Sequence, residues 1–211
     1  ATGDFTLATA DLDEPAACAE AARCLECDLV CDVCVTVCPN RANVAWTTAL
    51  VRLPLVTIRP AGDGFSTEPD GEFTVDQARQ VLHLADFCNH CGNCTTFCPT
   101  SGEPFRNKPR FALADACWAE EDGIHRLERD GRDLRLRHKA DGREQVLTRR
   151  GAVLVWETPE AVVELDAASF AVRRVRFLAE PARPVSLRDA AALAVLLGGF
   201  ALEGEGPWLV S

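Results

Sequence analysis

Nine of the eleven cysteines lie in two short runs, and these are the residues whose spacing could do chemistry. The second run reads Cys88-x2-Cys91-x2-Cys94-x3-Cys98-Pro99, which is the spacing of segments that bind a [4Fe–4S] cluster. Three thiolates on one short loop can each reach a different iron of one cubane. The fourth follows a longer spacer and precedes proline, so it can reach a second cluster. The pattern predicts iron–sulfur chemistry.

The first run ends in the same way, in Cys31-x2-Cys34-x3-Cys38-Pro39, but it begins differently. The spacing of the second run would put a cysteine at position 28, which is an aspartate. Cys27 lies one residue too early and Cys24 four residues too early. A loop enlarged by one residue favours Cys27 as the ligand, with Cys24 as a structural cysteine near the end of an incoming helix. The reverse assignment, with Cys24 as the ligand, stays open.

Two ligand sets follow from this alignment, and each takes its last sulfur from the other run. The predicted sets are Cys27, Cys31, Cys34 and Cys98 for one [4Fe–4S] cluster, and Cys88, Cys91, Cys94 and Cys38 for the other.

Two other metal chemistries fit the cysteine pattern less well. Structural zinc sites place two cysteine pairs a dozen or more residues apart, unlike these dense runs that close on Cys-Pro. Radical enzymes use the spacing of Cys27, Cys31 and Cys34, but they need a large α/β barrel for which this chain is too short. Cys18 and Cys117 have no partners at ligand spacing, so we expect both to be small buried residues.

Composition excludes several further classes of function. The net charge of −10 argues against nucleic-acid binding, which needs a basic surface. No apolar run reaches the ~20 residues that span a membrane, and the first residues do not resemble a signal peptide. A cytoplasmic, reducing location is therefore predicted for the thiolates. No dinucleotide fingerprint, phosphate loop or catalytic triad is present, so we expect a part that transfers electrons without catalysing a reaction.

Charge divides the chain into two regions. Residues 1–118 hold 16 acidic and 8 basic residues, whereas residues 119–185 hold 13 of each. The predicted organisation is a leader or linker over 1–15, a dicluster domain over 16–117 with an insertion at about 47–80, and a small β-rich domain over 118–211. The fold class is thus α+β, a two-[4Fe–4S] ferredoxin-like domain with an insertion followed by a β-rich domain with a C-terminal helix.

Local patterns place the elements around the cysteines. Residues 14–27 read as a helix with Pro15 in its first turn, and residues 80–84 read as the strand that enters the second run. Residues 60–72 are dense in Gly, Pro and Asp and read as a loop. Short strands separated by Asp-Gly and Arg-Gly turns follow residue 118. A helix over 185–200 is expected to begin after Ser186 and to end at its paired glycines, 198 and 199.

The segments EAARCLEC, CDVCVTVCPNRANV and ADFCNHCGNCTTFCPTSGEPFRNKPRF resemble the C-terminal part of the selenate reductase iron–sulfur subunit family, which is related to the small subunit of glutamate synthase. The resemblance covers roughly residues 16–113. It implies the eight ligand cysteines given above, with Cys24 also present in the family's pattern. It also implies a flavin- and NADPH-binding partner region and electron exchange with a molybdenum hydroxylase.

The sequence therefore predicts an electron relay through two [4Fe–4S] clusters, between a flavin- or NADPH-dependent partner and a terminal redox enzyme such as a molybdenum hydroxylase. The rival hypothesis is a non-redox assembly or interaction subunit in which the clusters only hold the fold together.

Overall fold

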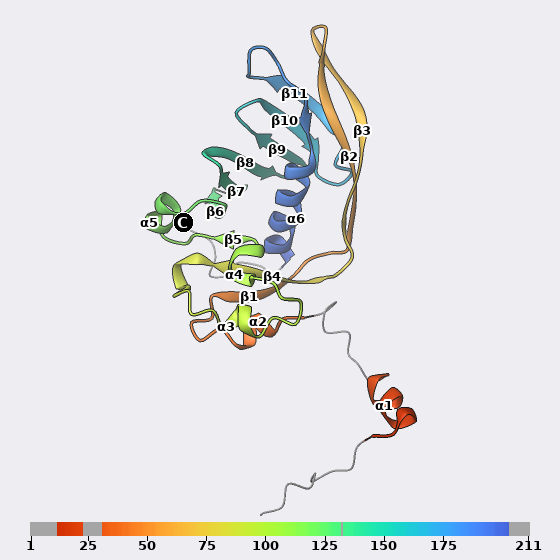
Figure 1. Ribbon diagram of the computed structural model, residues 1–211. Coiled ribbons are helices and arrows are strands. Elements are labelled where there is room, and N and C mark those ends of the chain that lie inside the picture. Colours follow the sequence, from red (N-terminus) through yellow and green to blue (C-terminus); the bar gives the residue numbers. More distant parts are fainter. Residues whose placement is uncertain (1–11, 23–30, 132, 203–211) are drawn as a thin grey trace, which may run out of the picture. The chain divides into compact units, whose positions relative to one another are not determined.

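The computed structural model describes residues 12–22, 31–131 and 133–202, and the chain divides into two units, 1–31 and 32–211 (Figure 1). In the first unit, α1 (Glu14–Ala21) begins where predicted. Its N-cap is Asp13, whose side chain accepts a hydrogen bond of 2.8 Å from the backbone of Ala16. Ala22 is the C-cap of α1, and residues 23–27 of the predicted helix lie outside the described residues. Cys18 is exposed on α1, so the prediction that it is buried is wrong, because this short helix buries none of its residues.

The second unit is built on a nine-stranded sheet that includes strands from both sides of residue 118. In spatial order the strands are β1 (Asn43–Thr47), β4 (Arg79–Leu84), β5 (Arg110–Phe111), β6 (Ile124–Asp130), β7 (Asp133–Ala140), β8 (Arg143–Arg150), β9 (Val153–Glu157), β10 (Ala161–Asp166) and β11 (Val172–Phe177). Only the β4–β5 and β5–β6 pairs are parallel. The composition boundary near residue 118 therefore does not coincide with a break in the sheet, and a division of function there stays a prediction.

Strands β6 to β11 form an antiparallel meander, as the turn signals predict. The turns after β6, β7 and β8 each contain a glycine with positive φ, namely Gly131 at 62°, Gly142 at 71° and Gly151 at 58°. This backbone conformation favours glycine and suits tight hairpins. These glycine-containing turns are the reason that the sequence predicts short strands in this half of the chain.

The predicted insertion forms a long hairpin of β2 (Val51–Ala61) and β3 (Gly64–Val75), joined at Gly62 with φ 53°. With β12 (Val185–Ser186) the hairpin makes a second, three-stranded sheet. The prediction that residues 60–72 form a loop is wrong. Most of that segment is β3, where pairing with β2 along almost the whole strand outweighs the poor strand propensity of its Gly, Pro and Asp residues.

Helix α6 (Arg188–Leu202) lies between the nine-stranded sheet and the hairpin (Figure 1). It packs on strands of both sheets, including β1, β2, β7 and β8, and its apolar side chains complete the core. Fully buried side chains of that core include Leu55, Ile58, Leu136, Leu147, Leu165, Leu187 and Leu197. Burial of this apolar surface is the main source of stability for the second unit.

The paired glycines do not end α6, which is a correction to the sequence prediction. The helix continues to Leu202, and Gly199 meets the indole ring of Trp46 on β1. A Cβ atom at position 199 would lie 2.0 Å from Cζ3 of that ring. Gly199 therefore permits a close contact between helix and strand, where Trp46 is buried and stacks on Phe200 with ring centroids 6.2 Å apart.

Short helical segments carry or flank the cysteines. They are α2 (Val33–Thr36), η1 (Ala85–Phe87), α3 (Asn93–Thr96), α4 (Pro104–Asn107) and α5 (Asp115–Glu120). None of the helices in the described ranges is long and apolar enough to cross a membrane. The second unit is mixed α/β and mostly sheet, and its assignment to the dicluster ferredoxin class stays a prediction.

Candidate metal centre

The two cysteine runs have the same local structure, offset by sixty positions along the chain. Helix α2 follows one cysteine and contains the next, and α3 repeats this arrangement in the second run. Each ends with the same capping bond, from the backbone of Val37 to Val33 and from Phe97 to Asn93, both 3.0 Å. The two helices contact each other (Figure 1). Segments far apart in the sequence are thus brought together as an internal repeat.

The Cys-Pro turns repeat as closely as the helices. Arg41 and Ser101, three residues after the final cysteine of each run, both adopt φ 54°. This conformation turns the next backbone N–H towards the cysteine sulfur. Ala42 donates to Sγ of Cys38 at 3.2 Å, and its counterpart Gly102 donates to Sγ of Cys98 at 3.2 Å. Backbone donors of this kind stabilise a thiolate and tune a bound cluster.

Cys98 receives one contact that Cys38 lacks. The hydroxyl oxygen of Thr100 lies 3.4 Å from Sγ of Cys98. This side-chain hydrogen bond is the main cause that lowers the pKa of the Cys98 thiol, and backbone bonds from Gly102 and Thr100 lower it further. The thiolate form, which is the form that binds metal, is favoured there.

The pKa of the Cys88 thiol is influenced by three other cysteines. Burial is the main cause that raises the pKa of the Cys88 thiol, and a hydrogen bond from the backbone of His90 offsets part of the rise. Negative charge on neighbouring thiolates raises this pKa further, and those neighbours are Cys94, Cys38 and Cys91. The four sulfurs are those of the second predicted ligand set. Four thiolates whose charges oppose one another suit a cationic group that would neutralise them.

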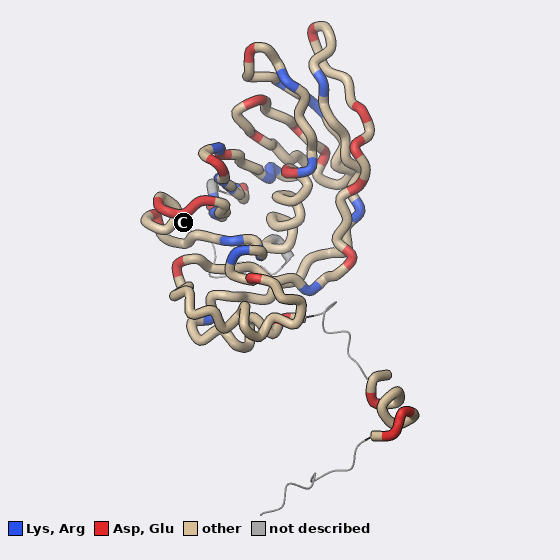
Figure 2. The backbone as a smooth tube through the Cα atoms, viewed as in Figure 1, with Lys and Arg blue, Asp and Glu red and all other residues tan. Residues whose placement is uncertain are grey.

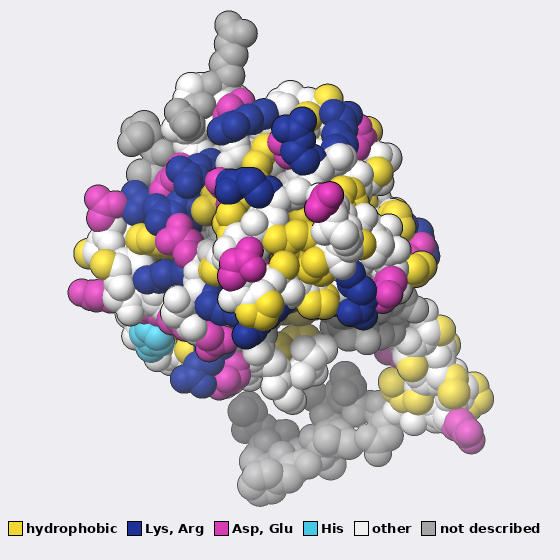
Figure 3. Space-filling model, turned by 90° about the horizontal axis from the view of Figure 1, so that it is seen from above, with side chains coloured by type: hydrophobic (Ala, Val, Ile, Leu, Met, Phe, Trp, Pro, Cys, Tyr) yellow, Lys and Arg dark blue, Asp and Glu magenta, His cyan; other side chains and the backbone are white. Residues whose placement is uncertain are grey.

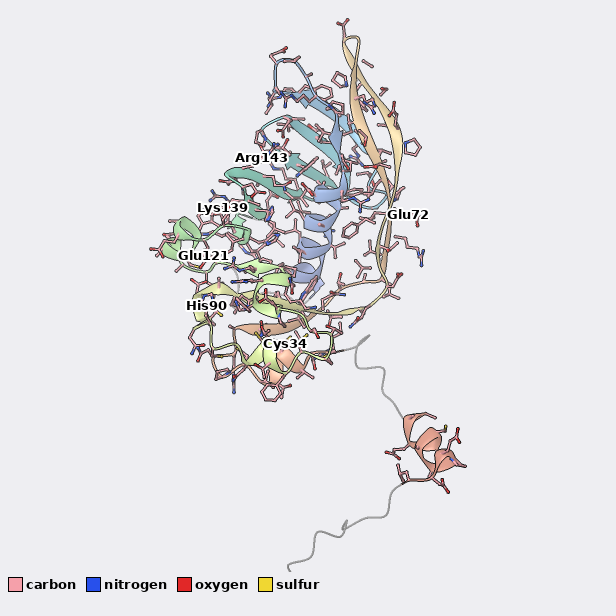
Figure 4. All side chains as sticks on the ribbon, in the orientation of Figure 1. Cys34, Glu72, His90, Glu121, Lys139 and Arg143 are labelled. Carbon is pink, nitrogen blue, oxygen red and sulfur yellow. The ribbon has the colours of Figure 1, made fainter. Side chains whose placement is uncertain are left out.

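The loop of the second run has the backbone shape that its sequence demands. Gly92 has φ 80° and caps α3, and His90 has φ 55°. The exposed ring of His90 packs edge-on against Phe105, with centroids 5.6 Å apart. His90 is therefore a loop residue at the edge of the candidate centre, as Figure 4 shows, and Gly92 leaves open space where a side chain would project.

A buried hydrogen-bond chain connects the sheet to the first run. The side-chain amide of Asn43 on β1 donates to the carbonyl oxygen of Cys34 at 2.9 Å. The Nδ1 atom of His83 on β4 lies 2.8 Å from Oδ1 of Asn43 and must be the donor, since that oxygen only accepts. Both side chains are 2% exposed. Burial, and then the charge of Arg110, lowers the pKa of His83 to about 4, so this imidazole is neutral at pH 7.

Sequence reasoning assigned His83 correctly to a strand but missed Asn43. The signal was available, because an Asn that opens an apolar strand just after a Cys-Pro turn needs buried partners for its amide. One ion pair and one backbone hydrogen bond to a carboxylate add to the positioning. The guanidinium of Arg79 binds Asp32 just before α2, with Nε 2.8 Å from the carboxylate, and Asp86 accepts from the backbone of Leu113 at 2.7 Å.

The first predicted ligand set is only partly described. Cys24 and Cys27 lie outside the described residues, and Cys31 is the last residue of the first unit. Cys34 is buried and Cys98 half-buried in the second unit, where Figure 4 labels Cys34 on α2. The first set and the choice between Cys24 and Cys27 stay predictions.

In the described part of the chain, no three His, Cys, Asp or Glu side chains converge as the ligands of a single ion do. A cubane makes a different demand, because each thiolate binds its own corner iron and the sulfurs lie farther apart. The choice between a cluster and a lone zinc ion at these cysteines stays a prediction.

The stretches of sequence around α2 and α3 contain almost no charged residues. Residues 87–102 contain no Asp, Glu, Lys or Arg, and Arg41 is the only such residue over 33–48. The backbone around α2 and α3 in Figure 2 is accordingly almost free of red and blue. Phe87 and Phe97 are 48% and 58% exposed beside the second run.

A cavity of about 590 Å³ lies elsewhere in the second unit, and none of its described lining residues is a cysteine. Arg143, His138 and Asp189 contribute to its wall, and both signs of charge are present. Arg143 is already paired with Glu160. Figure 4 shows Arg143 well away from Cys34, so this cavity is not part of the cysteine site.

Comparison with known proteins finds similarity in about half of the chain. Over 111 residues, 52% of the chain, it is 41% identical to the protein named "Putative oxidoreductase YgfK" in Escherichia coli K12 and to its counterpart in Escherichia coli O157:H7. The matched stretch spans 8% of the length of those relatives. No protein-family model and no solved structure matches the chain.

Proposed function

We propose that this protein transfers electrons through two [4Fe–4S] clusters as part of an oxidoreductase system. The observation that carries the proposal is the structural repeat of the two cysteine runs, in which α2 and α3 contact each other and Ala42 and Gly102 donate equivalent hydrogen bonds to Cys38 and Cys98. The electrostatic influence of Cys38 on Cys88 agrees with it. Sharing a sulfur between runs is the arrangement expected of paired clusters. Similarity to a protein named as an oxidoreductase supports a redox role.

The chain's own residues would do most of the positioning. Cys38, Cys88, Cys91 and Cys94 would hold one cluster, and Cys98 with Cys34, Cys31 and Cys27 would hold the other, with Cys24 as the alternative to Cys27. Ala42 and Gly102 would donate backbone hydrogen bonds to the shared sulfurs. When bound, such clusters supply one-electron carriage over a wide range of potentials.

The partners follow from this chemistry. A flavin exchanges two electrons, whereas each cluster carries one. Two clusters in series would therefore let a flavin- or NADPH-dependent partner pass its electrons one at a time to a terminal enzyme, such as a molybdenum hydroxylase. The relatives extend far beyond the matched stretch, so a flavoprotein region within the same complex is part of the proposal. Thiolates kept reduced for metal binding suit the cytoplasm.

Metal analysis of anaerobically purified protein tests the proposal. We expect about eight irons and eight inorganic sulfides per chain, with visible absorbance that dithionite bleaches reversibly. Cys38→Ala should lose about half of the iron, whereas Cys18→Ala, a matched change at an exposed cysteine of α1, should keep all of it.

Two outcomes would contradict the proposal in different ways. Zinc in place of iron, or about four irons per chain in the unaltered protein, would refute the paired clusters. Two clusters that resist reduction between about −700 and +450 mV would favour the non-redox assembly role instead.

A further inference from the structure

We propose that Thr100 makes the reduction potentials of the two clusters differ. It does so by donating a hydrogen bond to Cys98 that raises the potential of the cluster bound through Cys98. This inference rests on the proposed function and deepens it, because it gives the relay a downhill direction. It comes from comparing the two Cys-Pro turns, each of which serves as a reference for the other.

The third and fourth residues after the final cysteine make the same backbone contacts in both runs. The residue three positions after each cysteine has φ 54°, and its N–H lies 3.2 Å from the cysteine carbonyl oxygen in both runs. The following N–H lies 3.2 Å from the sulfur in both runs. Apart from a smaller backbone contribution of Thr100 to Cys98, the main-chain contacts of Cys38 and Cys98 are therefore equal.

The side chain two positions after the cysteine breaks this equality. Thr100 places its hydroxyl oxygen 3.4 Å from Sγ of Cys98. Its counterpart in the first run is Asn40, which makes no hydrogen bond to Cys38 among the contacts of the described residues. Cys98 thus has one more donor than Cys38.

The chemistry fixes the direction of this hydrogen bond and of its effect. An iron-bound thiolate carries no proton, so the hydroxyl of Thr100 must donate and the sulfur must accept. A donor withdraws electron density from the sulfur. It stabilises the reduced cluster, which carries one more negative charge, more than the oxidised cluster. Reduction of the Cys98-bound cluster therefore becomes more favourable.

The cluster bound through Cys98 is expected to fill with electrons first. Because Thr100 is exposed, water competes for the sulfur and limits the effect. We expect a change of up to about tenfold in the ratio of reduced to oxidised cluster, which is ~59 mV for a one-electron couple.

Redox titration of three variants tests the inference, with absorbance and electron paramagnetic resonance as readouts. Thr100→Val should lower the potential of one cluster and leave the other unchanged, and Thr100→Ser, which keeps the hydroxyl, should change neither. Asn40→Thr supplies the missing donor in the first run and should raise the potential of the other cluster, the one that Thr100→Val leaves alone.

Iron content separates the possible failures. A protein without two [4Fe–4S] clusters refutes the proposed function before any potential is measured. Full iron content with no shift in Thr100→Val, or with equal shifts in both clusters, refutes the role of Thr100 alone. If Thr100→Val does not retain its clusters, Asn40→Thr decides, since an unchanged pair of potentials there contradicts the inference.

Discussion

The cysteine region and the β-rich region of the second unit are held together in different ways. The cysteine runs contain 4-residue helices and few buried apolar side chains, and the second run has no charged residue. The sheet from β6 to β11 packs a continuous apolar core against α6, and ion pairs such as Arg137 with Glu128 and Glu144 lie across its strands. On the face seen in Figure 3, Lys and Arg side chains surround hydrophobic ones.

The contrast separates the source of stability from the source of chemistry. Hydrophobic burial stabilises the sheet and α6 without any help from sulfur. The cysteine loops depend on turn geometry and on a few hydrogen bonds from the sheet, and the proposed clusters would add metal–sulfur bonds. A substitution in one region should therefore affect a different property from a substitution in the other.

Removal of a core side chain should have the largest effect on stability. Leu147 on β8 is fully buried against the α6 side of the core, so Leu147→Ala should lower the free energy of unfolding by about 2–5 kcal/mol. Val35→Ala in α2, where the side chain is only half-buried, should cost less than about 1 kcal/mol. Urea unfolding followed by circular dichroism measures both. Equal losses would show that the cysteine region is as well packed as the sheet.

The paired glycines of α6 offer an internal control for close packing. Gly199→Ala would press a methyl group into the indole of Trp46 and should cost about 1–3 kcal/mol. Gly198→Ala meets nothing within 4 Å and should stabilise the protein by up to about 1 kcal/mol, because alanine has the higher helix propensity. Thermal unfolding of the two variants should thus shift in opposite directions. Two shifts in the same direction would contradict the close contact.

Acid should weaken the connection between the two regions. The pKa of His83 is about 4 in the folded protein, against an ordinary value of 6.5, so the unfolded chain binds more protons between these values. The stability from His83 is complete above pH 6.5 and is lost as the pH falls towards 4. Between pH 7 and pH 5 the loss should be about 2 kcal/mol.

His83→Gln isolates this effect, because glutamine can donate to Asn43 but does not titrate. The variant should lose about 2 kcal/mol less than the unaltered protein when urea unfolding is repeated at pH 7 and pH 5. Other buried histidines contribute equally to both proteins. The same pH dependence in both would mean that His83 titrates normally in the fold.

Much of the local structure could be predicted from sequence, because its signals are short-range. Asp-Gly and Arg-Gly turns predict the strands of the meander. The predicted strand over 80–84 agrees with β4 to within one residue. The failures have a common cause in long-range contacts. Strand β3 exists because it pairs with β2, and Gly199 stays helical because Trp46, from a distant strand, packs against it. No pattern within one window could reveal either contact.

The candidate site divides in the same manner. Spacing singles out Cys88, Cys91 and Cys94, and the repeat predicts that Cys38 joins them as a ligand, which stays a prediction. The chain from His83 through Asn43 to Cys34 could not be foreseen in detail, since it depends on the register that pairs Asn43 with His83 across β1 and β4.

That register has a consequence for how the protein matures. Strand pairing alone brings His83 and Asn43 opposite each other, and their imidazole and amide then hold the helical turn that carries Cys34. These contacts need no metal, so under the proposed function cluster assembly would order the cysteine loops on a sheet that has already formed.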